Sequence, residues 1–102
     1  MFSYKLIFFF ELVELKFQNK PLGLILGPAQ NETRCVVEEI LDDELIQSTP
    51  LRKNWEVIQI NKKQCHFKNF EDIEAILEET EAPLTIYFQN NDTTRGRSRF
   101  LI

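Results

Sequence analysis

The chain has 102 residues, of which 43% are hydrophobic and 27% charged, and its formal net charge is -4. This length suits one domain with a single hydrophobic core, and the acidic balance argues against a general nucleic-acid binder, which needs a basic face. Two cysteines thirty positions apart and a single histidine give neither metal-ligand spacing nor a disulfide framework. We therefore expect no metal and no cofactor, and reduced thiols in the cytoplasm are the simplest interpretation.

Residues 1–10 form an apolar N-terminal extension that contains Leu-Ile-Phe-Phe-Phe. The segment is too short to span a bilayer, Glu11 interrupts it, and no small-residue cleavage site of a signal peptide follows. With Lys5 as its one basic residue, it also lacks the charge that membrane-surface binding needs. We expect an extra strand that is covered by the domain or by another copy, or else a segment added for expression.

Alternation of apolar and polar residues predicts the strands. Val13, Leu15 and Phe17 alternate with polar residues, which is the period of a half-buried strand. Similar or shorter apolar runs, bounded by turn residues, predict further strands. These strands are expected at residues 24–26, 34–40, 55–60, 64–66 and 84–88.

Two helices are predicted between these strands. The acidic start at residues 42–45 opens a short helix that ends before Pro50. A longer helix begins at Phe70 after the N-cap residue Asn69, and Asp72 three positions later completes a pair similar to a capping box. The predicted class is α+β: a small, partly open antiparallel barrel or sandwich of five to six strands with one short and one long helix. It spans residues 11–89 and is followed by a flexible basic tail at 90–102.

The stretch Pro-Leu-Gly-Leu-Ile-Leu at residues 21–26 lies between two of the alternating runs. Gly23 can adopt backbone conformations that are closed to other residues, so a tight connection is expected there. In such a turn the amide hydrogens of Leu22, Gly23 and Leu24 converge on a small anion-binding concavity, for which a peptide's terminal carboxylate is a natural guest. An ordinary strand–turn–strand segment of the core is the alternative interpretation.

This order of elements, with its glycine turn between the first two regular strands, resembles a PDZ domain. The resemblance rests on residues 21–24 as the carboxylate loop and on residues 55–61, which are similar to the family's Gly-Asp-Glu-Ile-Leu-x-Val-Asn-Gly stretch. The long helix also follows at the family's usual separation. Asn54 and Trp55 replace the usual Gly-Asp and Lys62 replaces the final Gly, so these turns must be built differently.

The resemblance implies a protein-interaction module, not an enzyme, that binds the C-terminal peptides of other proteins. The peptide would add as a strand between the second strand and the long helix, in the mode known as β-augmentation. The residues that would bind the peptide carboxylate are the amides of Leu22, Gly23 and Leu24, with Lys16 or Lys20 assisting through water. The pocket for the last side chain would be lined by Leu22, Leu24, Leu26 and Leu77.

Peptide specificity is expected to come from Phe70, Ile73 and Glu74. Many family members carry a histidine at the position of Phe70, where it bonds a Ser or Thr of the ligand. Phenylalanine offers an apolar surface instead, so termini of the type hydrophobic-x-hydrophobic are expected. Pro28 has no amide hydrogen to donate, so recognition should be confined to the last few ligand residues.

The tail ends in Phe100, Leu101 and Ile102, which match this ligand type and follow several arginines. The tail is therefore a candidate ligand for its own groove or for that of a neighbouring copy, and a disordered tail is the alternative. The alternative function is a structural, self-assembling domain whose groove is occluded and which oligomerises through the N-terminal aromatic strand.

Catalysis has little support in the sequence. His66 has no evident nucleophile partner and is interpreted as a surface strand residue. Cys35 and Cys65 are interpreted as ordinary, partly buried thiols.

Overall fold

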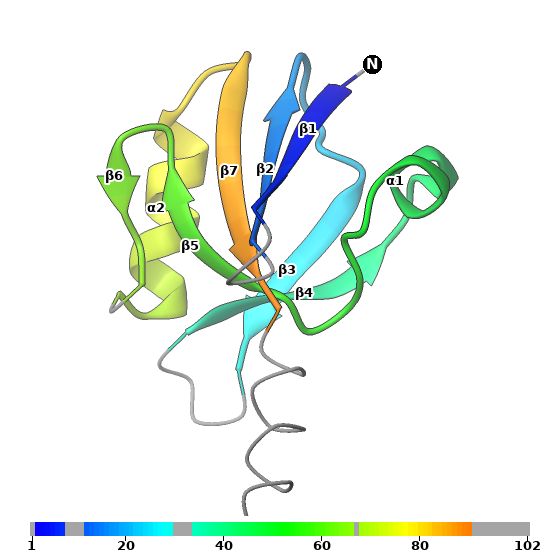
Figure 1. The fold of residues 1–102 in the computed structure, drawn as a ribbon. Helices are drawn as coiled ribbons and strands as arrows, with labels where there is room; N and C mark the ends of the chain where they lie inside the picture. Colours follow the sequence, from blue (N-terminus) through cyan, green and yellow to red (C-terminus); the bar gives the residue numbers. More distant parts are fainter. Residues whose placement is uncertain (1, 8–11, 30–33, 67, 91–102) are drawn as a thin grey trace, which may run out of the picture.

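The computed structural model describes residues 2–7, 12–29, 34–66 and 68–90, with only the backbone described for residues 2–7. It is an α+β domain in which one short and one longer helix accompany an open antiparallel sheet (Figure 1). The helices are α1 (Asp43–Ser48) and α2 (Phe70–Glu79). The strands are β1 (Phe2–Ile7), β2 (Leu12–Phe17), β3 (Leu24–Pro28), β4 (Cys35–Ile40), β5 (Glu56–Ile60), β6 (Lys63–Gln64) and β7 (Leu84–Gln89).

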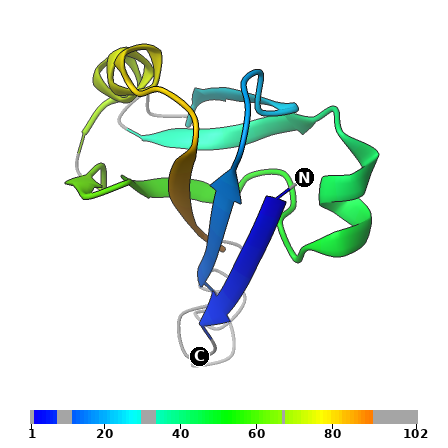
Figure 2. The ribbon, with the colours of Figure 1, turned by 90° about the horizontal axis from the view of Figure 1, so that it is seen from above.

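The strands lie in the order β1-β2-β7-β5-β4-β3, and the two-residue strand β6 pairs with β5 beside this path. Every strand pair is antiparallel. Strands β1 and β3 end the sheet, as the view from above shows (Figure 2). The predicted class, an α+β fold with a partly open antiparallel sheet, is therefore confirmed, and the six strands of the main path agree with the expected number.

The core forms where the inward faces of the central strands meet the helices. Val13, Leu15 and Phe17 of β2 are buried, while the residues between them are more exposed, as the alternating pattern predicted. In β7 the buried alternate residues are Leu84, Ile86 and Phe88. Each such side chain stabilises the fold by about 1.5–3 kcal/mol through removal of apolar surface from water.

Helix α2 begins at the predicted cap Asn69, and α1 begins after Asp42, which caps it in the same way. The Asn69 side-chain oxygen accepts a hydrogen bond from the Asp72 amide at 2.9 Å, and the Asp42 carboxylate accepts one from the Glu44 amide at 2.9 Å. Each bond satisfies an amide hydrogen that has no partner inside the helix. Helix α2 ends where the Thr80 amide donates back to the carbonyls of Ile76 and Leu77.

Two asparagines form the turns that precede and follow β5. Asn54 has a φ of 75° and Asn61 a φ of 51°, both in the left-handed region that asparagine tolerates better than most residues. The Asn54 amide donates to the Val37 carbonyl at 2.8 Å, and the Asn61 side chain accepts from the Thr85 amide at 2.8 Å. Both asparagines therefore hold a left-handed conformation, Asn54 before β5 and Asn61 in the turn between β5 and β6.

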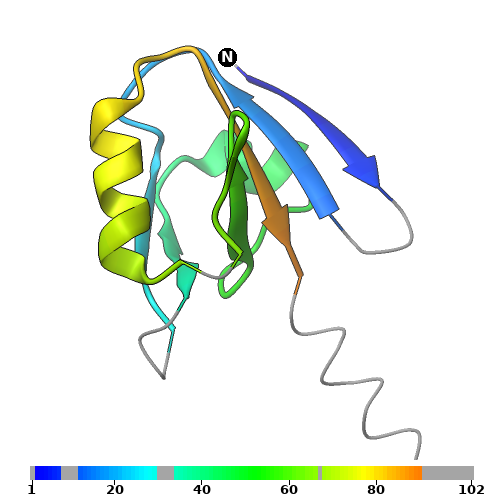
Figure 3. The ribbon, with the colours of Figure 1, turned by 90° about the vertical axis from the view of Figure 1, so that its left-hand side faces the viewer.

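Helix α2 lies at the β3 side of the sheet. It runs alongside β3 in Figure 3, and the view from above places it at the same side (Figure 2). Ile73 anchors it to the core with no exposed surface. Within the described ranges, neither helix is long and apolar enough to cross a membrane.

Candidate functional site

The connection from β2 to β3 depends on Gly23. Its φ of 82° is unfavourable for residues with a side chain, and a Cβ there would lie 2.8 Å from the Asp42 Cβ. The Gly23 carbonyl accepts hydrogen bonds from the amides of Leu41 and Asp42 at 2.8 and 3.0 Å. The loop is therefore fixed to the segment that opens α1, as a tight glycine turn requires.

The amide hydrogens of Leu22 and Gly23 make no hydrogen bond to any residue that the structure describes. Both residues are partly exposed. The Gly23 carbonyl, by contrast, accepts from Leu41, the residue that directly follows β4. Because hydrogen bonding alternates along an antiparallel strand, the next residue, Leu24, turns its own amide and carbonyl away from β4.

Leu26 also points its backbone groups away from β4. Its partner in the β3–β4 register is Val37, whose amide donates to the Trp55 carbonyl at 2.9 Å and whose carbonyl accepts from the Asn54 amide. Both backbone groups of Val37 therefore bond toward the β5 side, so Val37 and Leu26 do not exchange hydrogen bonds. Strand β3 therefore presents the amide hydrogens of Leu24 and Leu26 at an edge that no described strand covers.

Leucines from the loop, β3 and α2 pack against one core. Those side chains are partly buried and include all four pocket candidates, Leu22, Leu24, Leu26 and Leu77, together with Phe70. Two other predicted specificity residues differ, since Ile73 is fully buried and Glu74 is exposed. An apolar surface that is half core and half exposed is what a groove wall requires.

The two candidate lysines lie in different environments. The Lys20 ammonium donates to the Leu77 carbonyl at 2.5 Å, which joins the β2–β3 loop to the last turn of α2. A cation at a helix C-terminus also complements the partial negative charge there. Lys16 is exposed on β2, opposite Thr85 of β7. The predicted tail ligand, Phe100, Leu101 and Ile102, lies outside the described residues.

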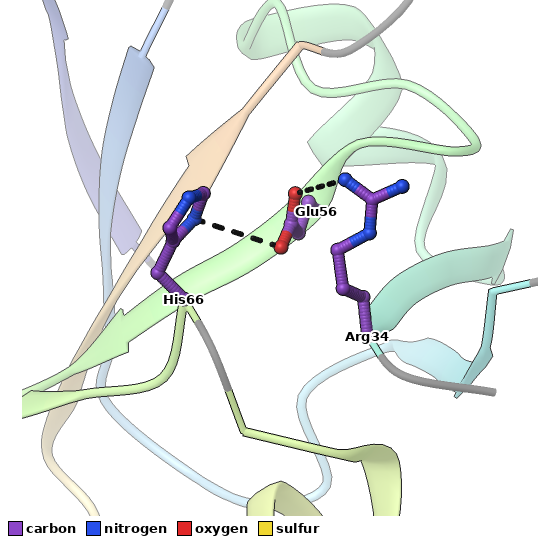
Figure 4. Close-up of polar contacts among 3 residues, drawn as sticks. All are labelled: Arg34, Glu56 and His66. Carbon is purple, nitrogen blue, oxygen red and sulfur yellow. Dashed lines mark hydrogen bonds and ion pairs between the residues drawn. The ribbon is translucent and has the colours of Figure 1, made fainter. Parts of the chain in front are cut away.

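A buried carboxylate on β5 is a feature that the sequence analysis missed. The Glu56 side chain is 1% exposed, and its two oxygens lie 3.5 Å from the Arg34 guanidinium and 3.7 Å from the His66 Nδ1 atom (Figure 4). Both partners are themselves only half-buried. The available signal was the single charge inside the apolar run from Trp55 to Ile60.

A cavity of about 510 Å³ opens beside this cluster and is lined by Ile58, Gln64, His66 and Lys68. These described lining residues lie on β5, on β6 and in the segment after β6, and none of them lies on β3. None of the four described residues that line this cavity is a serine, threonine or cysteine. Across the described part of the chain, no three His, Cys, Asp or Glu residues are grouped so as to hold a metal ion.

Both thiols are buried and free. Burial raises the pKa of Cys35 from 9.0 to about 12, with a smaller contribution from Cys65, and burial also raises the pKa of Cys65. Such thiols stay protonated and unreactive near neutral pH. The pKa of Tyr87 is raised by a hydrogen bond to Glu14, its neighbour across the β2–β7 pair.

Comparison with known proteins adds no family to this description, because no protein-family model matches the chain and no curated protein is similar enough in sequence to match it.

Proposed function

We propose that this domain binds the C-terminal segment of another protein as an added β-strand between β3 and α2, as its resemblance to PDZ domains implies. The observation that carries the proposal is the pair of outward amide hydrogens on Leu24 and Leu26, at an open edge beside a helix. Such an edge is a template for an extended peptide. The function is that of an adaptor or scaffold module.

The ligand's carboxylate would be held at the β2–β3 loop. The amides of Leu22 and Gly23 have no partner among the described residues, and the Leu24 amide points to the edge of β3 that no described strand covers. Three donors close together in sequence suit an anion. The hydrogen bond from Lys20 to Leu77 holds the β2–β3 loop against the end of α2, and the Lys20 ammonium places a positive charge near this loop.

The ligand's last side chain would rest on the partly buried leucines of β3 and α2. Phe70 at the start of α2 would contact the residue two before the ligand's end, which favours an apolar residue there. Pro28 offers a carbonyl but no amide hydrogen, so the added strand would lose one bond beyond that point. Glu74 is exposed on α2 and favours a cation near the ligand.

The test is binding of a fluorescent peptide that ends in hydrophobic-x-hydrophobic with a free carboxylate. We expect a dissociation constant of about 1 μM, which corresponds to a binding free energy of about -8 kcal/mol. The amidated peptide, and a peptide with Ser or Thr two before the end, should both bind more weakly. Equal affinity for the free and amidated peptides would contradict the proposal.

Methylation of single ligand amides provides a matched control for strand addition. Alternate residues of an added strand point their amides toward the sheet. Methylating the amide of the residue two before the ligand's end removes a bond to β3, and the expected loss is about tenfold in affinity. Methylating the amide of the next residue toward the end should leave affinity nearly unchanged. Equal effects at the two positions would exclude strand addition.

A further inference from the structure

Strand β1 forms the other edge of the sheet. Its six residues pair with β2 from Phe2 opposite Phe17 to Ile7 opposite Leu12, and the register does not shift along the pair. Among the described residues, no strand pairs with its outer side. A long, regular edge strand with one charged residue, Lys5, readily accepts another strand.

The hydrogen-bond pattern of the sheet determines which β1 residues face outward. The Thr85 carbonyl accepts from the Asn61 amide at 2.7 Å, so Thr85 faces β5 and the next residue, Ile86, faces β2. Ile86 is opposite Leu15 in an unshifted register, and this pair therefore exchanges hydrogen bonds. The next residue on β2, Glu14, must then face β1.

Lys5 lies opposite Glu14 in the β1–β2 register. Because Glu14 faces β1, Lys5 and Glu14 exchange backbone hydrogen bonds, and Lys5 therefore faces β2. Ser3 also faces β2, because it is separated from Lys5 by one residue. The residues between them turn the other way. Phe2, Tyr4 and Leu6 therefore present their amide hydrogens and carbonyl oxygens at the free edge.

The two edges of the sheet differ in how they are protected. Strand β3 carries Pro28, which cannot donate, and its register with β4 shifts between Ile25 and Leu26. Strand β1 has neither a proline nor a shift. Irregularities of this kind prevent the pairing of whole strands, so β1 is the edge suited to a full-length partner strand.

We propose that β1 pairs antiparallel with β1 of a second copy of this chain, around a two-fold axis that passes through Tyr4. In an antiparallel pair, two residues directly opposite each other both turn their backbone groups toward the partner strand or both turn them away. Outward-facing residues of one copy must therefore lie opposite outward-facing residues of the other. In a pair of identical strands related by a two-fold axis, this requires one residue to lie opposite its own copy, at the axis. With Tyr4 at the axis, Phe2 faces Leu6 of the second copy and Ser3 faces Lys5.

The neighbouring registers are less favourable. An axis through Lys5 would place two positive residues directly opposite each other in a pair without mutual hydrogen bonds, where side chains come closest. An axis through Ser3 would shorten the paired length of β1. The Tyr4 register is the one that uses all three outward-facing residues and brings no like charges together.

Cysteine cross-linking tests the register directly. In Tyr4→Cys the two introduced thiols sit on facing residues, with Cα atoms about 5.5 Å apart, which a disulfide can bridge. In Ser3→Cys, the matched control that also keeps Lys5, the two positions are offset by two residues and lie roughly 8 Å apart, beyond disulfide reach. Under a mild oxidant we expect a covalent dimer from Tyr4→Cys alone, since Cys35 and Cys65 are buried. No dimer from Tyr4→Cys, or equal amounts from both variants, overturns the proposal.

Sedimentation of the unmodified chain without any peptide tests the association itself. We expect a species of twice the chain mass that dissociates on dilution. Tyr4→Pro removes an outward amide and no β1–β2 bond, so it should weaken the dimer at least about tenfold while the fluorescence of the buried Trp55 stays native. A chain that remains monomeric at high concentration, or a Tyr4→Pro variant that associates as well as the unmodified chain, overturns the proposal. Neither result depends on whether the β3 edge binds peptides.

Discussion

Glu56 is the charged residue with the least exposed side chain in the described chain, and its surroundings explain how the fold tolerates it. One oxygen lies 3.5 Å from Arg34 and the other 3.7 Å from His66, so positive or polarisable groups flank the carboxylate on both sides. Moving a charged group from water into the protein interior costs several kcal/mol, and nearby groups of this kind compensate part of that cost. The three residues come from β5 and from the chain just before β4 and just after β6, so the cluster links neighbouring parts of the sheet.

Arg34→Met should destabilise the domain by about 1–3 kcal/mol, because it leaves the buried carboxylate less well compensated. Lys53→Met, at an exposed position with no ion pair to any described residue, should change stability by less than about 0.5 kcal/mol. In a Glu56→Gln background the cost of Arg34→Met should fall by at least about 0.5 kcal/mol. Urea unfolding of the four variants measures this, and a cost unchanged by Glu56→Gln would refute the pairing.

At the scale of the element, β3 and its loop depend on two glycines for different reasons. Gly23 is held at a positive φ with the Asp42 Cβ directly beside it. Gly27 faces the side chain of Glu38, which the bulge in β4 brings over it. The first restriction lies in the backbone, whereas the second comes from an exposed and flexible side chain that can move aside.

Gly23→Ala should therefore cost about 1–2 kcal/mol for the left-handed conformation alone, and more from the contact with Asp42. Gly27→Ala, the matched substitution in the same hairpin, should cost less than about 1 kcal/mol. Thermal or urea unfolding compares them. If Gly27→Ala proved the more damaging of the two, this account of the loop would be wrong.

At the scale of the whole molecule, the sheet offers two edges with different properties. The β3 edge lies beside α2 and ends in a proline, which suits a short peptide. The β1 edge lies at the far end of the strand order, is regular over its whole length, and suits a copy of itself. The central strand β7 is paired on both sides and should be the slowest part of the sheet to open.

Amide hydrogen exchange should distinguish the two edges in one experiment. In dilute protein without peptide, the outward amides of Leu24 and Leu26 should exchange faster than that of Gly27, which faces β4. Added peptide should slow Leu24 and Leu26, whereas a higher protein concentration should slow Tyr4 and Leu6. The assignment of the two edges would be contradicted if peptide alone slowed exchange at all four amides. It would also be contradicted if neither added peptide nor a higher protein concentration slowed any of them.

The sequence by itself determined the features that depend on neighbouring residues. Asn69 indicated the start of α2 because a cap bonds to an amide a few positions away, and the acidic residues 42–44 indicated the start of α1. The alternation in β2 indicated which of its faces is buried. The glycine turn at Gly23 was also visible, since only glycine accepts that backbone conformation readily.

Only the tertiary structure decided which strands are neighbours and which backbone groups remain available. The burial of Glu56 between Arg34 and His66 joins residues distant in sequence, and no local pattern encodes it. The bond from Lys20 to Leu77 spans 57 positions. The outward direction of the Leu24 and Leu26 amides follows from bonds that Leu41, Trp55 and Asn54 make elsewhere in the chain. Hydrogen-bond partners across a sheet are fixed by the packing of the whole domain, and this is why residue type alone could not supply them.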